Sequence, residues 1–222
     1  MLKLIKLEWK KNNIGKYIRN AAILFPALCF LTFLVARDPG TGEISLFIET
    51  LSSMSFLIFT SVMLSSFIVS AYKNKTMNLM FSYPIKRQKI LVSQMLAVWI
   101  FNFAALALTK LLLYGIILAC SRFMELPCSI DFDMASAGFY IQHIIKAAIT
   151  VTMSFISLFI GMNMKSSKAT ITSSFVLIIL TQANLGDFAM AENLVLPAIL
   201  MVASLIFAFL SIRKVETNDL MW

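Results

Sequence analysis

Three charged side chains lie inside, or at the edges of, strongly apolar segments: Glu49, Lys110 and Lys146. Charges inside a membrane are costly, and by default they mark either a functional site or mutual pairing. A lysine near a membrane surface can instead extend its long side chain to the head groups by itself. For these residues we expect independent extension to the external head groups, or a structural pair between Glu49 and one lysine, rather than a substrate site.

Other residue types that commonly carry chemistry are sparse. His143 is the only histidine, and no Cys/His cluster has the spacing of a metal site. No glycine stands in a nucleotide-binding motif, and no carboxylate pair lies deep in an apolar segment. His143 is expected to be a satisfied side chain near the outer end of a helix, with a ligand or proton-relay role as the alternative. The sequence therefore predicts no catalytic residue, metal or cofactor, and no enzyme activity.

The elements that position these residues are predicted to be membrane-spanning helices. Of the 222 residues, 59% are hydrophobic and 14% are charged, and the mean hydropathy is +0.85, which is far from a soluble domain. Six apolar segments come close to the ~20 residues that a spanning helix needs. They are Ala21–Ala36, Leu46–Ala71, Ile90–Cys120, Phe139–Met162, Ala169–Asn184 and Leu194–Ile212. We therefore predict an all-α polytopic membrane protein, in which residues 1–222 form one domain with six transmembrane helices.

The distribution of basic residues predicts the orientation of the chain. Most lysines and arginines precede the first segment or lie between the second and the third, whereas only Arg37 and Arg122 fall in external loops. By the positive-inside rule both termini are cytoplasmic, and the chain is a multi-pass protein of the cell membrane. The net charge of +8 is accordingly interpreted as a determinant of membrane orientation, and no nucleic-acid partner is expected.

Residues 1–20 mix basic and apolar side chains, as the neighbours Trp9 and Lys10 illustrate. As a helix they would present a face that lies along the inner membrane interface. Asn12, Asn13 and Gly15 would then end this helix and turn the chain into the membrane. A basic leader that only sets the topology is the equal alternative.

The three cysteines of the chain contribute little to a functional prediction. Cys29 lies in the first apolar segment and is expected to be ordinary packing. Cys120 and Cys128 both lie near the predicted external face, where a disulfide is chemically feasible. Two free thiols are nevertheless the expected state, because no other disulfide framework is present.

The stretch between the second and third segments, residues 72–89, combines basic charge with an apolar patch. Thr76 can cap a short helix, on which Met77, Met80 and Phe81 share one face by their i, i+3, i+4 spacing. A proline follows that disfavours helix at the residue before it and suits the first turn of the next helix. The apolar face either occupies a groove in a partner protein or lies on lipid.

The same stretch, KNKTMNLMFSYPIKRQKILVSQ, resembles the cytosolic loop of type-2 ABC transporter permeases (ABC-2 type). That family's loop runs roughly as K-x-x-T-x-x-L-L/M-x-S/T-x-P-I-x-R-x-x-I-L-x-S/A-K. The matching residues are Lys73, Thr76, Leu79, Met80, Ser82, Pro84, Ile85, Arg87, Ile90, Leu91 and Ser93. The chain departs from the pattern at Lys75, where the family often has Gly, and at Gln94, where Lys is common. The six segments, the basic leader and the small external loops extend the resemblance over nearly the whole chain.

The resemblance implies a permease subunit of an ATP-driven exporter, with ATP bound by a separate cytosolic ABC ATPase. The loop would hold a coupling helix seated in a cleft of that ATPase. The residues implied for this contact are Thr76, Met77, Met80, Phe81, Ser82, Pro84 and Arg87. Two permease protomers, identical or different, would combine with two ATPases. The short chain resembles permeases that expel amphipathic, antimicrobial or toxic peptides.

Two other functions stay open from the residues themselves. A stand-alone secondary transporter or channel would use Glu49, Lys110 and Lys146 and would work without ATP. A structural or assembly protein of the membrane would instead use its basic loop to bind anionic lipid.

Overall fold

The computed structural model describes residues 2–37, 44–73, 87–123, 136–182, 184–185, 188–189 and 195–217. The helices are α1 (Leu2–Lys11), α2 (Ile14–Ala36), α3 (Ile44–Leu64), the π-helical turn η1 (Ser65–Val69), α4 (Ser70–Lys73), α6 (Arg87–Phe123), α7 (Ala137–Asn163), α8 (Ser167–Gln182) and α9 (Val195–Thr217). Two short strands, β1 (Asn184–Leu185) and β2 (Phe188–Ala189), pair antiparallel between α8 and α9. The described chain is thus helical almost throughout.

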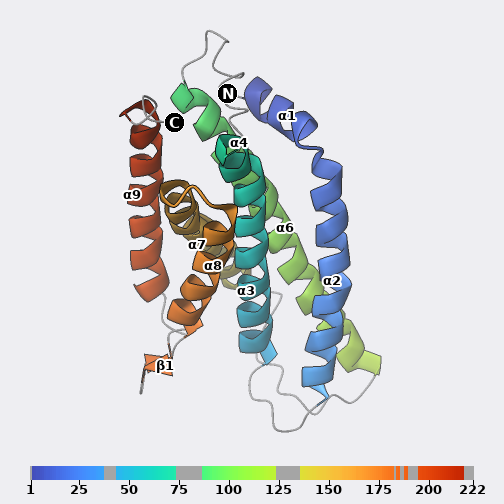
Figure 1. Ribbon diagram of the computed structural model, residues 1–222. Helices are drawn as coiled ribbons and strands as arrows, with labels where there is room; N and C mark the ends of the chain where they lie inside the picture. The colour runs from blue at the N-terminus through green and yellow to red at the C-terminus, as the bar shows by residue number, and fades with distance from the viewer. Residues whose placement is uncertain are drawn as a thin grey trace.

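The long helices run side by side along one axis (Figure 1). The short helix α1, the end of α4, the start of α6 and the end of α9 lie together at the top of this view. We call this end of the bundle the α1 end. The start of α3 and the end of α6 lie at the opposite end, which we call the distal end.

Among the described residues, four helical stretches are long and apolar enough to cross a membrane: Ile14–Ala36, Ile44–Val69, Gln88–Phe123 and Ala137–Asn163. Two further apolar stretches, Ser167–Thr181 and Pro197–Arg213, are shorter. A helix is the form in which a single segment satisfies its own backbone hydrogen bonds in lipid. The predicted all-α membrane fold is therefore confirmed, whereas six full-length spans are not.

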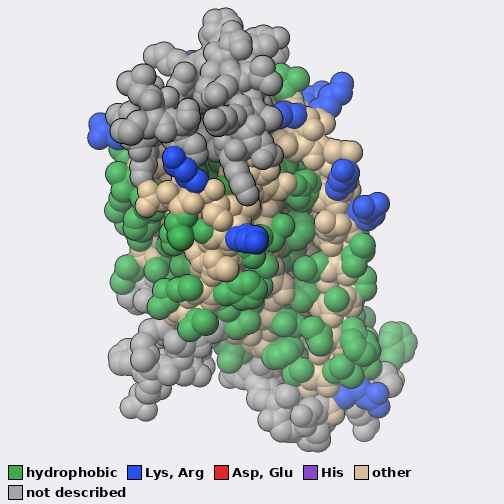
Figure 2. All heavy atoms as spheres, viewed as in Figure 1, with side chains coloured by type: hydrophobic (Ala, Val, Ile, Leu, Met, Phe, Trp, Pro, Cys, Tyr) green, Lys and Arg blue, Asp and Glu red, His purple; other side chains and the backbone are tan. Residues whose placement is uncertain are grey.

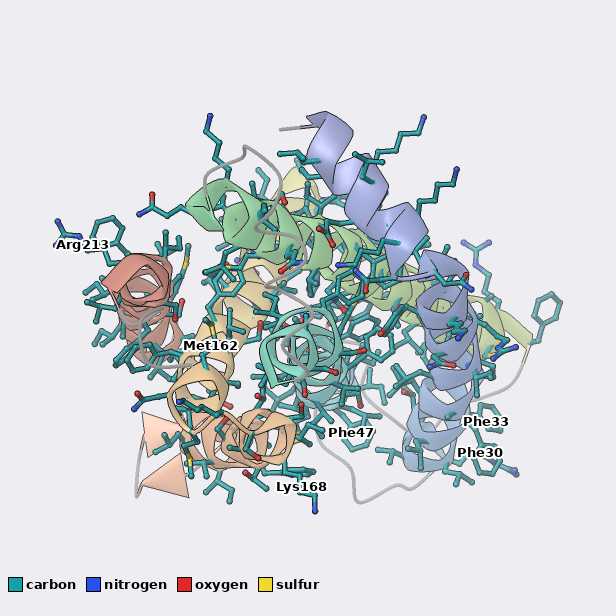
Figure 3. The ribbon with its side chains drawn as sticks, turned by 45° about the horizontal axis from the view of Figure 1, so that its top comes forward. Phe30, Phe33, Phe47, Met162, Lys168 and Arg213 are labelled. Atoms are coloured by element: carbon teal, nitrogen blue, oxygen red, sulfur yellow. The ribbon has the colours of Figure 1, made fainter. Side chains whose placement is uncertain are left out.

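The surface of the bundle has the character expected of a membrane protein. Figure 2 shows hydrophobic side chains over the middle of the visible face, while lysines and arginines gather mostly toward the α1 end. In Figure 3, which brings the α1 end forward, Phe30 and Phe33 of α2 lie on the outside of the bundle, as does Arg213 of α9. Phe30 is well exposed in the isolated chain, as is expected of a side chain on the apolar surface of a membrane protein.

The chain does not form one helix over residues 1–20, which corrects the predicted extent of the N-terminal helix. α1 ends at Lys11, and α2 begins at Ile14. Between them Asn13 has φ 51° and ψ 64°, a left-handed conformation that asparagine tolerates and that ends a right-handed helix. The break falls where the sequence places it, but residues 14–20 belong to the first long helix.

Helices reach into both ends of the predicted loop over residues 72–89. η1 and α4 extend the α3 helix to Lys73, and α6 is already helical at Arg87. Each added residue of an existing helix gains a backbone hydrogen bond, so a helix continues until a breaker stops it. The remaining residues, 74–86, lie outside the described part of the chain.

Hydroxyl groups and close packing join the helices inside the bundle. The hydroxyl of Ser61 on α3 donates to that of Ser157 on α7 at 3.3 Å, and Nε1 of Trp99 on α6 donates to Oγ1 of Thr152 on α7 at 3.0 Å. In lipid, such hydrogen bonds and van der Waals packing hold helices together, because lipid tails are as apolar as the helices themselves. Polar contacts between helices therefore stabilise the bundle at a few positions. The contact that involves charged side chains lies at the distal end.

Candidate functional site

Glu49 and Lys110 form a buried ion pair near the distal end of the bundle. Glu49 lies near the start of α3, and Lys110 lies in the distal part of α6. Nζ of Lys110 donates to Oε1 of Glu49 at 2.5 Å. The Lys110 side chain is 0% exposed and that of Glu49 is 12% exposed. Because an unpaired charge is costly away from water, each side chain depends on the other.

A third helix contributes His143, which lies near the start of α7. Its Nδ1 is 3.1 Å from Oε2 of Glu49. An ionised carboxylate only accepts hydrogen bonds, so Nδ1 carries a proton and donates it. The carboxylate of Glu49 therefore uses both oxygens, one toward α6 and the other toward α7.

Aromatic rings hold the imidazole of His143 in place. Its centroid lies 4.2 Å from that of Phe139 and 4.7 Å from that of Tyr114. The Tyr114 and Phe139 rings pack edge to face, with centroids 5.0 Å apart. The Tyr114 hydroxyl donates to the carbonyl oxygen of Ser45 at 3.3 Å, which ties α6 to α3. We call Glu49, Lys110, Tyr114, Phe139 and His143 the distal cluster.

Lys146 adds a further positive charge beside the distal cluster. It follows His143 on the same helix, is half-buried, and forms no ion pair among the described residues. Its charge acts on both Glu49 and Lys110. Because Glu49 and Lys110 neutralise each other, Lys146 carries the remaining charge among these three residues. The distal cluster can thus hold three helices together through the Glu49 carboxylate. If its internal contacts break, the same side chains can bind a charged group of another molecule.

The described part of the chain holds no group of three His, Cys, Asp or Glu side chains that could bind a metal ion. The ionisable groups of the distal cluster are instead one carboxylate, one ammonium and one imidazole, together with a phenol. The Lys110 ammonium and Nδ1 of His143 are both directed at the Glu49 carboxylate. The chemistry of the cluster is therefore that of ion pairing and hydrogen bonding.

The structure brings together two of the three predicted intramembrane charges. Lys110 pairs with Glu49, and the complete burial of Lys110 rules out its extension to the head groups. Lys146 stays outside the pair. The sequence predicts only a satisfied side chain at His143 and does not indicate its bond to Glu49. One signal in the sequence could have revealed this bond, namely the predicted depth of the two residues in the membrane. Glu49 and His143 both lie near the starts of helices that begin at the same predicted membrane face.

Most of the predicted coupling residues lie outside the described part of the chain: Thr76, Met77, Met80, Phe81, Ser82 and Pro84. Arg87 is the first residue of α6, and α6 begins at the α1 end of the bundle (Figure 1). Cys29 and Cys120 are half-buried free cysteines. Cys128, the suggested partner of Cys120, also lies outside the described residues.

A second buried polar cluster joins α1 to α6, and the sequence does not indicate it. Glu8 is 7% exposed, and its Oε2 accepts hydrogen bonds from Nε2 of Gln94 at 3.3 Å and from Nδ2 of Asn12 at 3.2 Å. Nε1 of Trp9 donates to the carbonyl oxygen of Ala97 at 3.1 Å. One face of α1 is therefore packed on α6, and only its other side is open to lipid or water.

The fold and the distal cluster together define a helical membrane protein with an intramembrane ion pair. The chain is similar to a Bacillus subtilis protein named "Uncharacterized protein YcbO". The two are 28% identical over 232 aligned positions, which cover 98% of this chain and 100% of the relative. No protein-family model matches the chain, and no solved structure matches it.

Proposed function

We propose that this chain is the membrane-spanning permease subunit of an ATP-driven exporter of the ABC-2 type. The observation that carries this proposal is where the two helices that flank the predicted coupling loop end and begin. α4 ends and α6 begins at the α1 end of the bundle, where α9 also ends (Figure 1). The segment with the resemblance to the family's coupling loop therefore leaves and re-enters the bundle on the side that carries both chain ends.

The proposal includes six crossings, with both termini in the cytoplasm of a cell-membrane protein. α9 has 23 residues and is about 34 Å long, but its apolar stretch is the shorter Pro197–Arg213, so it crosses a core of about 30 Å only with help from flanking residues. α8 has 16 residues and is about 24 Å long, so it needs local thinning of the bilayer or anchoring by flanking residues. Exposed apolar side chains such as Ile179 on α8 and Phe209 on α9 favour contact of both helices with lipid.

The clustering of lysines and arginines at the α1 end supports this orientation (Figure 2). At that end α1 is the proposed interfacial helix. It buries Ile5 and Glu8 on the protein side and exposes Lys6, Leu7 and Lys10. Exposed lysines next to an exposed leucine suit the boundary between anionic head groups and acyl chains.

In this proposal the partner subunit performs the ATP chemistry, and the permease binds no cofactor. The ATPase receives the coupling loop, in which Met77, Met80 and Phe81 occupy an apolar cleft. A second permease protomer completes the translocation path. The cargo is an amphipathic or antimicrobial peptide, in line with the small external loops that the resemblance rests on.

A second candidate function is a stand-alone secondary transporter or channel. The observation that favours it is the buried ion pair of Glu49 and Lys110, because ionisable residues inside a membrane often mark an ion or substrate path. It differs from the first proposal in needing neither an ATPase nor the coupling loop.

Co-purification with an ATPase decides between the two functions. The tagged chain, expressed in its own host, is expected to retain an ABC ATPase, and the purified complex is expected to hydrolyse ATP. Changing both Met80 and Phe81 to Asp should abolish this association, because a charge is costly in an apolar cleft. Phe123→Asp is the matched control, since Phe123 is an 89% exposed apolar residue at the distal end.

Three measurements make this experiment interpretable. Membrane insertion of every variant is checked by carbonate extraction, so that loss of folding is not mistaken for loss of docking. Equal retention of the ATPase by the loop variant and the control would disprove docking through this loop. Transport by the purified chain without any ATPase would favour the secondary transporter.

A further inference from the structure

The distal cluster joins three helices through charge, whereas their other polar contacts are neutral. Glu49 of α3 binds Lys110 of α6 and His143 of α7. Farther from the distal end, α3 and α7 meet through the hydroxyls of Ser61 and Ser157. The connection that depends on ionisation therefore lies at one end of the bundle only, within the described part of the chain.

An ion pair is a poor choice if the sole task is to hold these helices together. Apolar residues of similar volume often stabilise a buried site as well as an ion pair does, and the same helices bury apolar residues, including Ile48 and Leu106. An ion pair differs in one respect. It can be opened and closed by water or by a competing charge, whereas an apolar contact responds to neither. The pair is not sealed completely, because the Glu49 and His143 side chains are each 12% exposed.

Polar side chains also lie behind the distal cluster. Ser52 follows Glu49 on the same face of α3 and is 0% exposed. Asn102 on α6 is also 0% exposed, and its Oδ1 has no hydrogen-bond partner among the described residues. An orphaned carbonyl oxygen in a membrane protein is costly, and it would gain a partner if water or a polar solute entered. The distal cluster therefore lies between these buried polar side chains and the distal end of the bundle.

We propose that the distal cluster is a latch that closes the bundle at its distal end. When Glu49 is bound to both Lys110 and His143, α3, α6 and α7 are held together and Ser52 is shielded from water. When these contacts break, the three helices separate at this end and open a path to the interior. This latch goes beyond the proposed exporter function, from which it takes only the assignment of the distal end to the outside of the cell.

Cysteine accessibility tests the latch without any ATPase or known cargo. Ser52→Cys is introduced into a chain in which the three natural cysteines are replaced by Ala, and intact cells are treated with a membrane-impermeant maleimide. Labelling of the parent is expected to be slow. Glu49→Gln and, separately, His143→Phe should each raise the rate by roughly tenfold, the change that corresponds to about 1.4 kcal/mol. Ser61→Ala, which removes a neutral contact between α3 and α7, should leave the rate unchanged.

The double variant Glu49→Gln with Lys110→Met separates a latch from a purely structural pair. It removes the stranded ammonium, so stability recovers, but it also leaves no charge contact to close the distal end. A latch predicts that labelling of Ser52→Cys stays fast in the double variant. Labelling that returns to the parent rate, or that rises equally in Ser61→Ala, would overturn the proposal. Fast labelling seen only in permeabilised cells would support the latch while contradicting the proposed orientation.

Discussion

Lys110 and Glu49 are 61 residues apart in the sequence, yet Nζ of one lies 2.5 Å from Oε1 of the other. The lysine has no exposed surface, so its charge is compensated inside the protein and not by the head groups. The glutamate is shared with His143, which makes it the common acceptor for two donors from different helices. Removing this single carboxylate therefore affects two partners at once.

A double-mutant cycle measures the coupling between Glu49 and Lys110. Glu49→Gln should lower stability by about 1–3 kcal/mol, because it strands a buried ammonium. Adding Lys110→Met should recover part of this loss. Thermal unfolding in detergent reports both effects, and the cycle yields the pairwise term. The same cycle with Lys146→Met is the comparison and should show a smaller coupling, since Lys146 forms no ion pair with Glu49 in the described structure and acts on it only through its charge.

His143→Phe tests the second contact of Glu49. The phenyl ring keeps the packing against Tyr114 and Phe139 but cannot donate to the carboxylate. Loss of one hydrogen bond to a charged group should cost about 1.5–3 kcal/mol. In a background that already carries Glu49→Gln the same change should cost less than half as much. An equal loss of stability in both backgrounds would show that the imidazole is held by the rings of Tyr114 and Phe139 and not by Glu49.

Gly161→Ala tests the close approach of α7 and α8. A Cβ at Gly161 would lie 1.8 Å from Oγ1 and 2.9 Å from Cβ of Thr170. The helices must therefore move apart, at a cost of about 1–3 kcal/mol in the melting experiment. Thr170→Ala should restore only part of the loss, because its Cβ remains. Gly115→Ala is the matched control, with no atom within 4 Å of the new Cβ, and it should be neutral or slightly stabilising.

Trp9→Phe tests the docking of α1 on α6. The change keeps an aromatic ring but removes the hydrogen bond from Nε1 to the carbonyl of Ala97, which should cost about 0.5–1.5 kcal/mol. We expect faster amide exchange in α1 and in the first turns of α6, with little change in α7. Leu7→Ala is the comparison, since Leu7 is 61% exposed. If Leu7→Ala speeds exchange in α1 as much as Trp9→Phe does, lipid contact and not α6 holds this helix.

The sequence by itself determined the class of fold and the position of the first helix break. Both depend on local properties. A long apolar segment must satisfy its backbone within itself in lipid, which requires a helix. Asn13 can adopt the left-handed conformation that ends α1. The ends of the long helices were less well determined. α6 runs from Arg87 to Phe123, beyond the apolar segment Ile90–Cys120 at both ends, because a polar residue can continue a helix as an apolar one does.

Only the tertiary structure decided which charge meets Glu49. The sequence places Glu49, Lys110 and Lys146 at similar depth, but pairing depends on the rotation of each helix and on which helices are neighbours. A helix that is apolar on nearly all sides, such as α6, carries no strong pattern that indicates its buried face. For the same reason the partnership of Glu8 with Gln94 and the contact of Gly161 with Thr170 required the packed bundle. Long-range contacts between such helices are set by three-dimensional packing, which local composition does not specify.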